Sequence, residues 1–192
     1  MANADTPFGF RPVRYVGGGP YNGAFRLYSA AAGDATAMFI GDPVTLSGTS
    51  QTINGSIYSD VDQSATGNVV VGVIVGVVPV TNESLRYRAA STQRIVMVAD
   101  DPNLLFEIQE VSGGTALTAN DIGLNANFVV GSGSTTTALS GVELNNSGEA
   151  TTNTLDLKIV GLVDRPDNAI GEHAKWLVRI NRHQFVDQVA GV

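Results

Sequence analysis

The pattern of hydrophobic positions centres on one uninterrupted apolar segment, VVVGVIVGVVPV, at residues 69–80. Eight of its twelve residues are valine, and none is charged. β-Branched side chains lose rotamer freedom in a helix and pack well on a pleated sheet. Gly72, Gly76 and Pro79 disfavour a helix further, and the segment is too short to cross a bilayer as a helix. The pattern predicts a strand that is buried on both faces and bent at a glycine, with strands on either side of it.

Shorter segments in which apolar and polar residues alternate are typical of half-buried strands. They lie at 25–28, 85–88, 94–99, 104–110, 155–159 and 175–180. Asn54–Gly55 is the strongest short signal for a β-hairpin, and Gly41–Asp42–Pro43 predicts a turn before a strand through Val44 and Leu46. Strands at this spacing predict an all-β fold, either a compact barrel or a sandwich, with a β-tulip-like arrangement among the forms that fit.

The first 33 residues are predicted to form an extended N-terminal arm, and residues 34–192 the β domain. Three prolines and five glycines among residues 1–23 exclude a long helix and disfavour a regular internal strand. Aromatic rings in such a segment indicate that it lies against something. Two alternatives stay open: the rings cover the chain's own core, or they clasp a partner chain. The residues predicted to contact the partner are Phe8, Phe10, Arg11, Arg14, Tyr15 and Tyr21.

Two other stretches are poor in apolar residues. Residues 58–68 are predicted to be a polar loop, and Gly, Ser, Thr and Asn dominate residues 111–154. We interpret 111–154 as a long loop excursion that leaves the main sheet and returns to it. Within it, Thr118 with Asp121 predicts the cap of a single helical turn, and 128–130 predicts one short strand. Residues 183–192 are predicted to be a tail, either ordered against a partner or frayed.

Composition supports the same fold class and narrows the partners. Valine (24) outnumbers leucine (13), and lysine occurs only twice. The net charge is −7, with no basic stripe of the kind that nucleic-acid binding needs. Residues 1–33 carry three arginines against Asp5, whereas 34–192 carry eight basic and seventeen acidic side chains. A basic arm on an acidic body favours contact with an acidic neighbour, including another copy of the chain.

No catalytic, cofactor-binding or metal-binding constellation is evident, so we expect a protein that is not an enzyme and that needs no cofactor. The two histidines, His173 and His183, lie outside any metal-ligand spacing and are expected to be solvated or hydrogen-bonded locally. The acidic pairs Asp60/Asp62 and Asp100/Asp101 lack an EF-hand frame and are expected to serve in turns or to be solvated. There is no cysteine, and no signal peptide or membrane span is predicted.

Four segments together resemble a group of small structural proteins encoded in the head gene modules of tailed bacteriophages, the capsid decoration or cement proteins. They are TPFGFRPVRYVGGGPYNG (6–23), FIGDPVTLSG (39–48), LLFEIQE (104–110) with the loops after it, and GLVDRPDNAIGEHAKWLVRINRHQF (161–185). The resemblance covers most of the chain. It implies a β-rich fold, a homotrimer, and a place on the capsid exterior of the virion, where subunits of the major capsid protein meet. The lack of cysteine suits assembly in the reducing cytoplasm of the bacterial host.

Two further function classes remain as alternatives. One is a carbohydrate- or receptor-binding β-module of a phage fibre or tail, which needs an exposed aromatic platform. The other is a small β-barrel hydrolase, for which no catalytic set is visible in the sequence.

Overall fold

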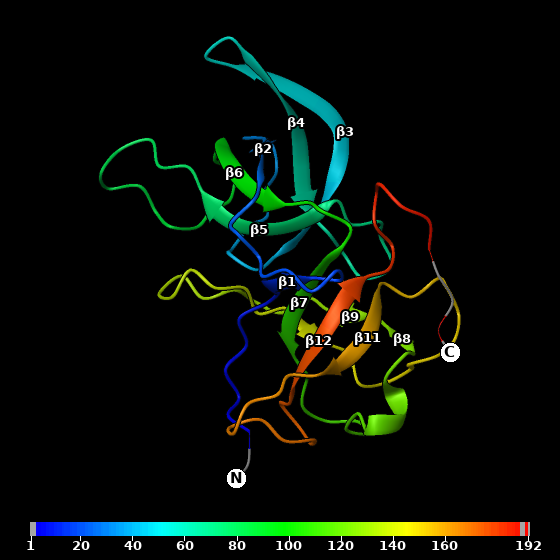
Figure 1. Cartoon of the computed structure of the whole chain (residues 1–192). Helices are drawn as coiled ribbons and strands as arrows, with labels where there is room; N and C mark the ends of the chain where they lie inside the picture. The colour runs from blue at the N-terminus through cyan, green and yellow to red at the C-terminus, as the bar shows by residue number, and fades with distance from the viewer. Residues whose placement is uncertain (1–2, 189–190, 192) are drawn as a thin grey trace.

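A computed structural model describes residues 3–188 and 191 of the chain, which form a barrel and a sheet packed together (Figure 1). The barrel closes in the order β2-β4-β3-β5-β6, and the five-stranded antiparallel sheet has the order β1-β7-β12-β11-β8. The barrel strands are β2 (Arg26–Ala30), β3 (Pro43–Ile53), β4 (Ser56–Gln63), β5 (Gly72–Val77) and β6 (Arg94–Ala99). The sheet strands are β1 (Arg11–Tyr15), β7 (Leu104–Gln109), β8 (Asn125–Ala126), β11 (Leu157–Leu162) and β12 (Lys175–Ile180). The predicted all-β class is confirmed.

Strand β5 lies where the two parts meet. The prediction of burial on both faces is confirmed for residues 70–74, whereas residues 75–78 are half-buried and 79–80 are exposed. Val70 and Val73 belong to the hydrophobic core beside the sheet, whereas Val71 and Ile74 belong to the core of the barrel. The pairing of β5 with β6 shifts register between Ile74 and Gly76, which is the predicted bend at a glycine. A strand with both faces apolar is therefore explained by its position between two cores.

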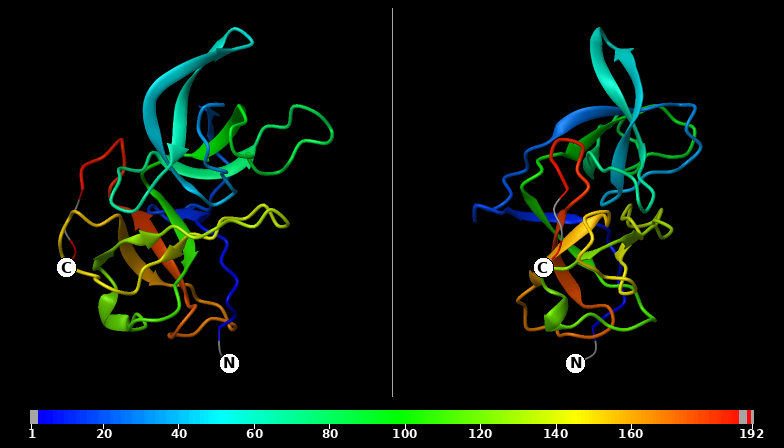
Figure 2. Two further views of the ribbon diagram at one scale, coloured as in Figure 1. Left: turned by 180° about the vertical axis from the view of Figure 1, so that it is seen from behind. Right: turned by 90° about the vertical axis from the view of Figure 1, so that its right-hand side faces the viewer.

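The excursion at 111–154 is more ordered than a set of loops. It holds the 3₁₀ turn η1 (Ala119–Asp121) and the small hairpin of β9 (Phe128–Val129) with β10 (Glu143–Leu144). Thr118 and Asp121 form the predicted capping box, and the predicted strand at 128–130 is β9. Phe128, Val142 and Leu144 are buried in the core of the sheet. Figure 2 shows the excursion lying over one face of the sheet, so that segment closes the core.

The β3–β4 hairpin projects beyond the barrel (Figures 1 and 2). Asn54 and Gly55 both have positive φ at its turn, as a two-residue hairpin of this kind requires. The prediction of a polar loop at 58–68 is wrong for the first six residues, which continue β4. Polar cross-strand bonds hold this strand, because the Asp60 carboxylate accepts from Thr49 Oγ1 at 2.8 Å and from Gln51 Nε2 at 3.0 Å. A hydrophobicity pattern does not detect a strand of this type.

The predicted strand at 85–88 is also wrong, since residues 78–93 form a projecting loop. Its anchor is Arg88, whose side chain is fully buried. The guanidinium donates to the Asp34 carboxylate at 3.1 Å and to the carbonyls of Asp34 (2.9 Å) and Thr92 (2.8 Å), and also to those of Ala31 and Thr36. A planar cation with five N–H groups thus joins two loops that contain little regular structure.

We expect Arg88→Met to lower the free energy of unfolding by roughly 3–5 kcal/mol, because Asp34 and several buried carbonyls lose their donor. Chemical denaturation monitored by circular dichroism measures this change. Arg86→Met is the matched control: Arg86 is exposed, so its replacement should change stability by no more than about 0.5 kcal/mol. Equal stability of the two variants would contradict a structural role for Arg88.

The predicted boundary at residue 33 does not separate an arm from the β domain. Strand β2 lies before it but pairs with β6 along its whole length and closes the barrel, with Tyr28, Ser29 and Ala30 buried. Strand β1 lies at the edge of the sheet and pairs with β7. Residues 1 and 2 of the predicted arm, and 189, 190 and 192 of the predicted tail, lie outside the described residues.

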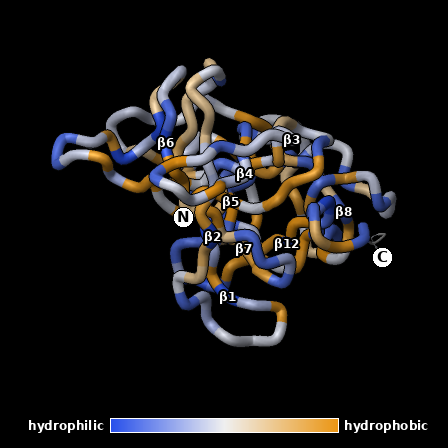
Figure 3. Tube along the Cα trace, turned by 90° about the horizontal axis from the view of Figure 1, so that it is seen from above, coloured by the Kyte–Doolittle hydropathy of each residue, from blue (hydrophilic) through white to orange (hydrophobic). Residues whose placement is uncertain are grey.

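Viewed from above, the apolar residues concentrate around β5, β7 and β12, where the barrel and the sheet meet (Figure 3). In the described part of the chain, no helix has the length and apolar character needed to span a membrane.

Candidate assembly interface

The N-terminal segment brings the six predicted contact residues to the junction of the barrel and the sheet. Phe8 and Phe10 are buried, with exposed fractions of 8% and 2%. The Phe10 ring lies edge-on to Phe106 and Phe128, with centroids 5.9 and 6.0 Å away. Both phenylalanines are thus packed within the chain, as expected under the alternative in which the segment completes its own core.

Close backbone contact fixes this segment. The backbone N–H of Phe10 donates to the Gly41 carbonyl at 2.9 Å. Gly9 has φ of 71°, and a Cβ added there would lie 2.5 Å from the same carbonyl oxygen. Glycine is needed at position 9 for its conformation and for the approach to the turn before β3. The two aromatic rings therefore enter the core on either side of a glycine.

The other four predicted residues lie nearer the surface. Arg11 is exposed, with its guanidinium 4.2 Å from the centroid of the Phe8 ring and 3.9 Å from the Glu107 carboxylate. Arg14 is exposed, and no hydrogen bond or ion pair of its guanidinium occurs within the described residues. Tyr15 and Tyr21 pack partly against the core of the sheet, and their hydroxyls donate to Asn22 and the Ala24 carbonyl. Of the six, the two arginines are the side chains most available to a partner.

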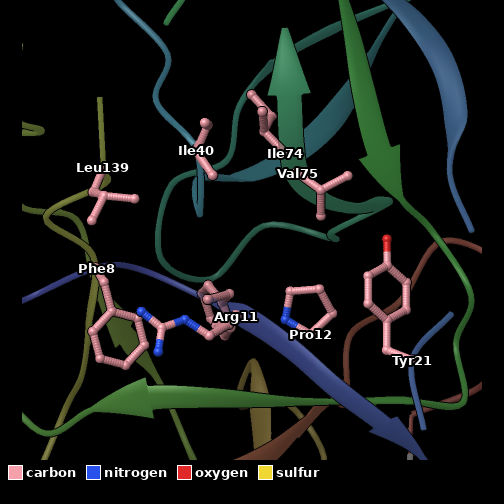
Figure 4. A pocket seen from close by; sticks show the side chains of 9 residues that line it. Phe8, Arg11, Pro12, Tyr21, Ile40, Ile74, Val75 and Leu139 are labelled. Carbon is pink, nitrogen blue, oxygen red and sulfur yellow. The ribbon is translucent and has the colours of Figure 1, made fainter. Parts of the chain in front are cut away.

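A cavity of about 290 Å³ separates the N-terminal segment from the barrel (Figure 4). Figure 4 shows Phe8, Arg11, Pro12 and Tyr21 along one side and Ile40, Ile74, Val75 and Leu139 along the other. Its lining is mostly apolar and includes no carboxylate or histidine. The cavity suits an apolar group.

Polar side chains clamp the start of this segment to the sheet. Gln109, which is fully buried on β7, directs its amide nitrogen to Asp5 Oδ1 (3.0 Å), Glu143 Oε1 (2.9 Å) and His173 Nδ1 (3.5 Å). Its amide oxygen accepts from the Thr6 N–H at 3.0 Å. Burial raises the pKa of Glu143.

Asp5, Glu143 and His173 are also ligand types that could hold a metal ion, since one atom of each lies within 4.8 Å of the others. The Gln109 amide nitrogen lies within 3.5 Å of one atom of each of the three side chains. The cluster therefore acts as a hydrogen-bonded clamp on the N-terminal segment.

His183 is buried, which corrects the expectation that it is solvated, although its hydrogen bond is local as predicted. Its Nδ1 accepts from the Phe185 N–H at 3.2 Å, and the backbone at His183 bridges to Val70. Burial lowers the pKa of His183 to about 4, so the ring is neutral near pH 7. It fixes the tail against the segment leading into β5.

The carboxyl group of Asp42, in the turn before β3, is fully buried and accepts from the Phe39 N–H at 2.7 Å. Burial raises the pKa of Asp42 to about 6, although hydrogen bonds from Ser140, Phe39 and Gln63 oppose the shift. Because the folded pKa lies above the unfolded value of 3.8, the folded state is favoured below both values. Stability is lost as pH rises through about 6.

We therefore expect Asp42→Asn to be more stable than the parent protein above pH 7, by roughly 3 kcal/mol if the whole shift is realised, with the advantage disappearing near pH 4. An asparagine keeps the acceptor for Phe39 and removes the charge. Denaturation of both proteins across this pH range isolates the effect, because all other titrating groups are common to the pair. Parallel pH profiles would contradict the assignment to Asp42.

The two most exposed of the large apolar side chains in the described residues lie on projecting parts of the barrel. Ile57 is 76% exposed at the β3–β4 hairpin, and Val80 (75%) and Leu85 (49%) lie on the loop between β5 and β6. The sequence indicated the hairpin turn but gave no sign that the hairpin projects.

Two exposed phenylalanines flank a depression of about 480 Å³ beside the barrel. Phe25 lies just before β2 and Phe185 follows β12, and both are nearly half exposed. Arg26 lies 3.4 Å from the Asp100 carboxylate and 5.7 Å from the Phe185 ring centroid. Asp100 also accepts from the Tyr28 hydroxyl at 2.7 Å, so this member of the Asp100/Asp101 pair has structural partners.

Comparison with known proteins finds no matching family model, no matching curated protein and no matching solved structure.

Proposed function

We propose that the chain is a non-enzymatic decoration protein of a tailed-bacteriophage head. It assembles in the host cytoplasm, acts as a homotrimer on the capsid exterior, and stabilises the contacts between major capsid protein subunits. The resemblance of residues 6–23, 39–48, 104–110 and 161–185 to such proteins motivates the proposal.

The observation that carries the proposal is the projecting β3–β4 hairpin with its exposed Ile57. A body whose two cores share β5 offers a rigid support, and the hairpin extends from it toward a neighbour. A contact of modest strength becomes strong when a shell repeats it many times. Such a protein requires shape and exposed apolar surface, and it requires no reactive group.

The placement of the ionisable groups agrees with this proposal. His173 lies in the clamp on the N-terminal segment, and His183 is buried against Val70. Asp60 holds the hairpin together through Thr49 and Gln51. Each of these groups has a structural role that explains its position.

The test is to add the purified protein to heads that lack it and to measure its copy number relative to the major capsid protein. We expect saturable binding over the whole shell, seen as regularly repeated density in electron micrographs. Ile57→Asp should fold normally and bind heads more weakly. Ile170→Asp is the matched control, because Ile170 is an exposed isoleucine on the loop before β12, at the other end of the molecule. Absence of binding to heads would refute the proposed function.

One observation favours a second candidate, a carbohydrate- or receptor-binding module of a fibre or tail. Phe25 and Phe185 present exposed rings beside the Asp100 carboxylate, and sugars bind to aromatic faces with polar groups nearby. The position of the copies on the particle separates the candidates. Density confined to a vertex or to the tail would favour the module, and density across the shell favours decoration.

A further inference from the structure

Basic side chains from distant parts of the sequence gather on one face of the sheet. Arg11 and Arg14 on β1 pair with Glu107 and Leu105 of β7, and Arg179 of β12 pairs with Leu105 on its other side. Lys158 of β11 pairs in turn with Arg179. Side chains of directly paired residues point to the same face of a sheet. Arg165, in the loop after β11, reaches the Glu107 carboxylate at 2.7 Å. We call this surface the basic sheet face; it comprises Arg11, Arg14, Lys158, Arg165 and Arg179.

The excursion at 111–154 leaves the basic sheet face uncovered, although Leu105, Glu107 and Leu177 on this face are themselves buried. The excursion at 111–154 lies over the opposite face, where Phe106, Trp176 and Val178 are buried (Figures 1 and 2). On the uncovered side, a depression of about 410 Å³ has Leu105 among its lining residues, together with the more exposed Val16 and Val160. The same depression is bordered by Arg14, Lys158 and Arg179. It combines an apolar floor with a cationic rim, which is the composition of a protein-binding surface.

Among the described residues, basic side chains outnumber the carboxylates that pair with them on this face, and Lys158 donates to the Gly123 carbonyl at 3.3 Å. Glu107 is the carboxylate on its strands, and it is buried between Arg165 and Arg11. Arg165 also lies 3.5 Å from Asp167. Arg179 donates to the Pro102 carbonyl at 2.9 Å. The guanidinium of Arg14 has no hydrogen bond or ion pair to any described residue.

The rest of the chain has the opposite charge. Five of the eleven basic residues lie on this face, where Glu107 and Asp167 are ion-pair partners. Of the other sixteen acidic side chains, five are buried (Asp42, Asp60, Asp100, Glu110 and Asp156), so eleven reach the surface. Of the other six basic side chains, Arg88 and Lys175 are buried, so four reach the surface. A second copy of the chain therefore offers the complementary surface.

We propose that the basic sheet face binds the acidic surface of a second copy of this chain. Two basic faces repel each other, so a twofold dimer through this face is disfavoured. The contact joins two different surfaces, and such a heterologous contact forms a closed ring when the rotation between neighbouring copies closes and an open filament when it does not. A trimer is the smallest ring of this kind, so the inference rests on the proposed homotrimer and identifies the surface that builds it.

The test compares the parent protein with Arg14→Glu by sedimentation velocity and light scattering at micromolar concentration. We expect the parent protein to associate, and Arg14→Glu to raise the dissociation constant at least tenfold. Arg86→Glu is the matched control, because it makes the same change of charge at an exposed arginine on the barrel loop and should leave association unchanged. Val16→Glu tests the apolar floor and should also weaken self-association. Because Val16 is 55% exposed, the variant should still fold. Raising the salt concentration should weaken association of the parent protein, since salt screens the charges.

A parent protein that stays monomeric, or an Arg14→Glu variant that associates as tightly as Arg86→Glu, would overturn the inference. Binding to heads, measured in parallel, separates this failure from failure of the proposed function. A monomer that decorates heads, and loses this ability with Arg14→Glu, would assign the face to the capsid protein instead. A protein that forms oligomers but does not bind heads would uphold the inference and refute the decoration role. Tight binding of single-stranded DNA that Arg14→Glu abolishes, without self-association, would assign the face to nucleic acid and also overturn it.

Discussion

Val73→Asp is expected to abolish folding. Val73 is fully buried in β5, where it pairs with Pro43 of β3 and Ala99 of β6 and contributes to the core beside the sheet. The core cluster to which Val73 belongs consists of apolar side chains. Burying an unpaired charge costs several kcal/mol, against a total stability of about 5–15 kcal/mol for a domain of this kind. The loss is larger than at an ordinary core position because β5 serves both cores.

Soluble expression, far-ultraviolet circular dichroism and thermal melting measure this effect. Val80→Asp is the matched control in the same apolar segment, since Val80 is 75% exposed and the variant should melt near the parent temperature. Val75, which is half-buried, should show an intermediate loss with the same substitution. Cooperative melting of Val73→Asp near the parent temperature would show that β5 is not the centre of the fold.

Deletion of residues 2–16 is expected to prevent a cooperative fold as well. The deletion removes Phe8 and Phe10 from the core and β1 from the edge of the sheet. Loss of one buried phenylalanine side chain costs about 3–5 kcal/mol, and here two are lost together with a paired strand. If the segment served only to clasp a partner, the truncated protein would instead fold and lose its oligomeric state or its binding to heads.

Point variants refine that experiment. Phe10→Ala should lower the free energy of unfolding by about 3–5 kcal/mol, because the ring contacts Phe106 and Phe128 at the centre of the core. Arg14→Ala should leave stability nearly unchanged, because Arg14 is exposed and without a described partner. A truncated protein that melts like the parent would contradict the placement of the segment in the core. Chemical denaturation of all three proteins provides the comparison.

The sequence by itself determined the features that depend on neighbouring residues. Eight valines in the segment 69–80 make a strand whose two faces are both apolar, because β-branched side chains restrict the backbone locally. Asn54–Gly55 adopts the positive φ angles of a hairpin turn, since these residues reach that conformation at low cost. Thr118 and Asp121 close their capping box over three residues. In each case the partner in the interaction lies close along the chain.

Features that depend on contact between distant segments were decided by the tertiary structure. Strand β4 is polar and gives no hydrophobic signal, yet it forms because β3 supplies Thr49 and Gln51 opposite Asp60. Arg88 lay in a predicted alternating strand and is instead fully buried in a loop, because residues 31–36, which are 52 to 57 residues away in sequence, supply most of its acceptors. From the sequence, Phe8 and Phe10 could either bind a partner chain or pack in the chain's own core. Contact of the Phe10 ring with Phe106 and Phe128 shows that it packs in the core.

In the candidate interfaces, too, the sequence determines local features and the tertiary structure determines which distant residues meet. The sequence identified Arg11 and Arg14 as basic residues of an N-terminal segment that contacts something. It could not show that Lys158, Arg165 and Arg179 join them, because strand order and register place β1, β7, β12 and β11 side by side, and a shift of one residue would turn each side chain to the other face. Hydrophobic periodicity determines that these strands form, whereas the fit between the two cores determines which strands pair and in which register, and therefore where their charges lie.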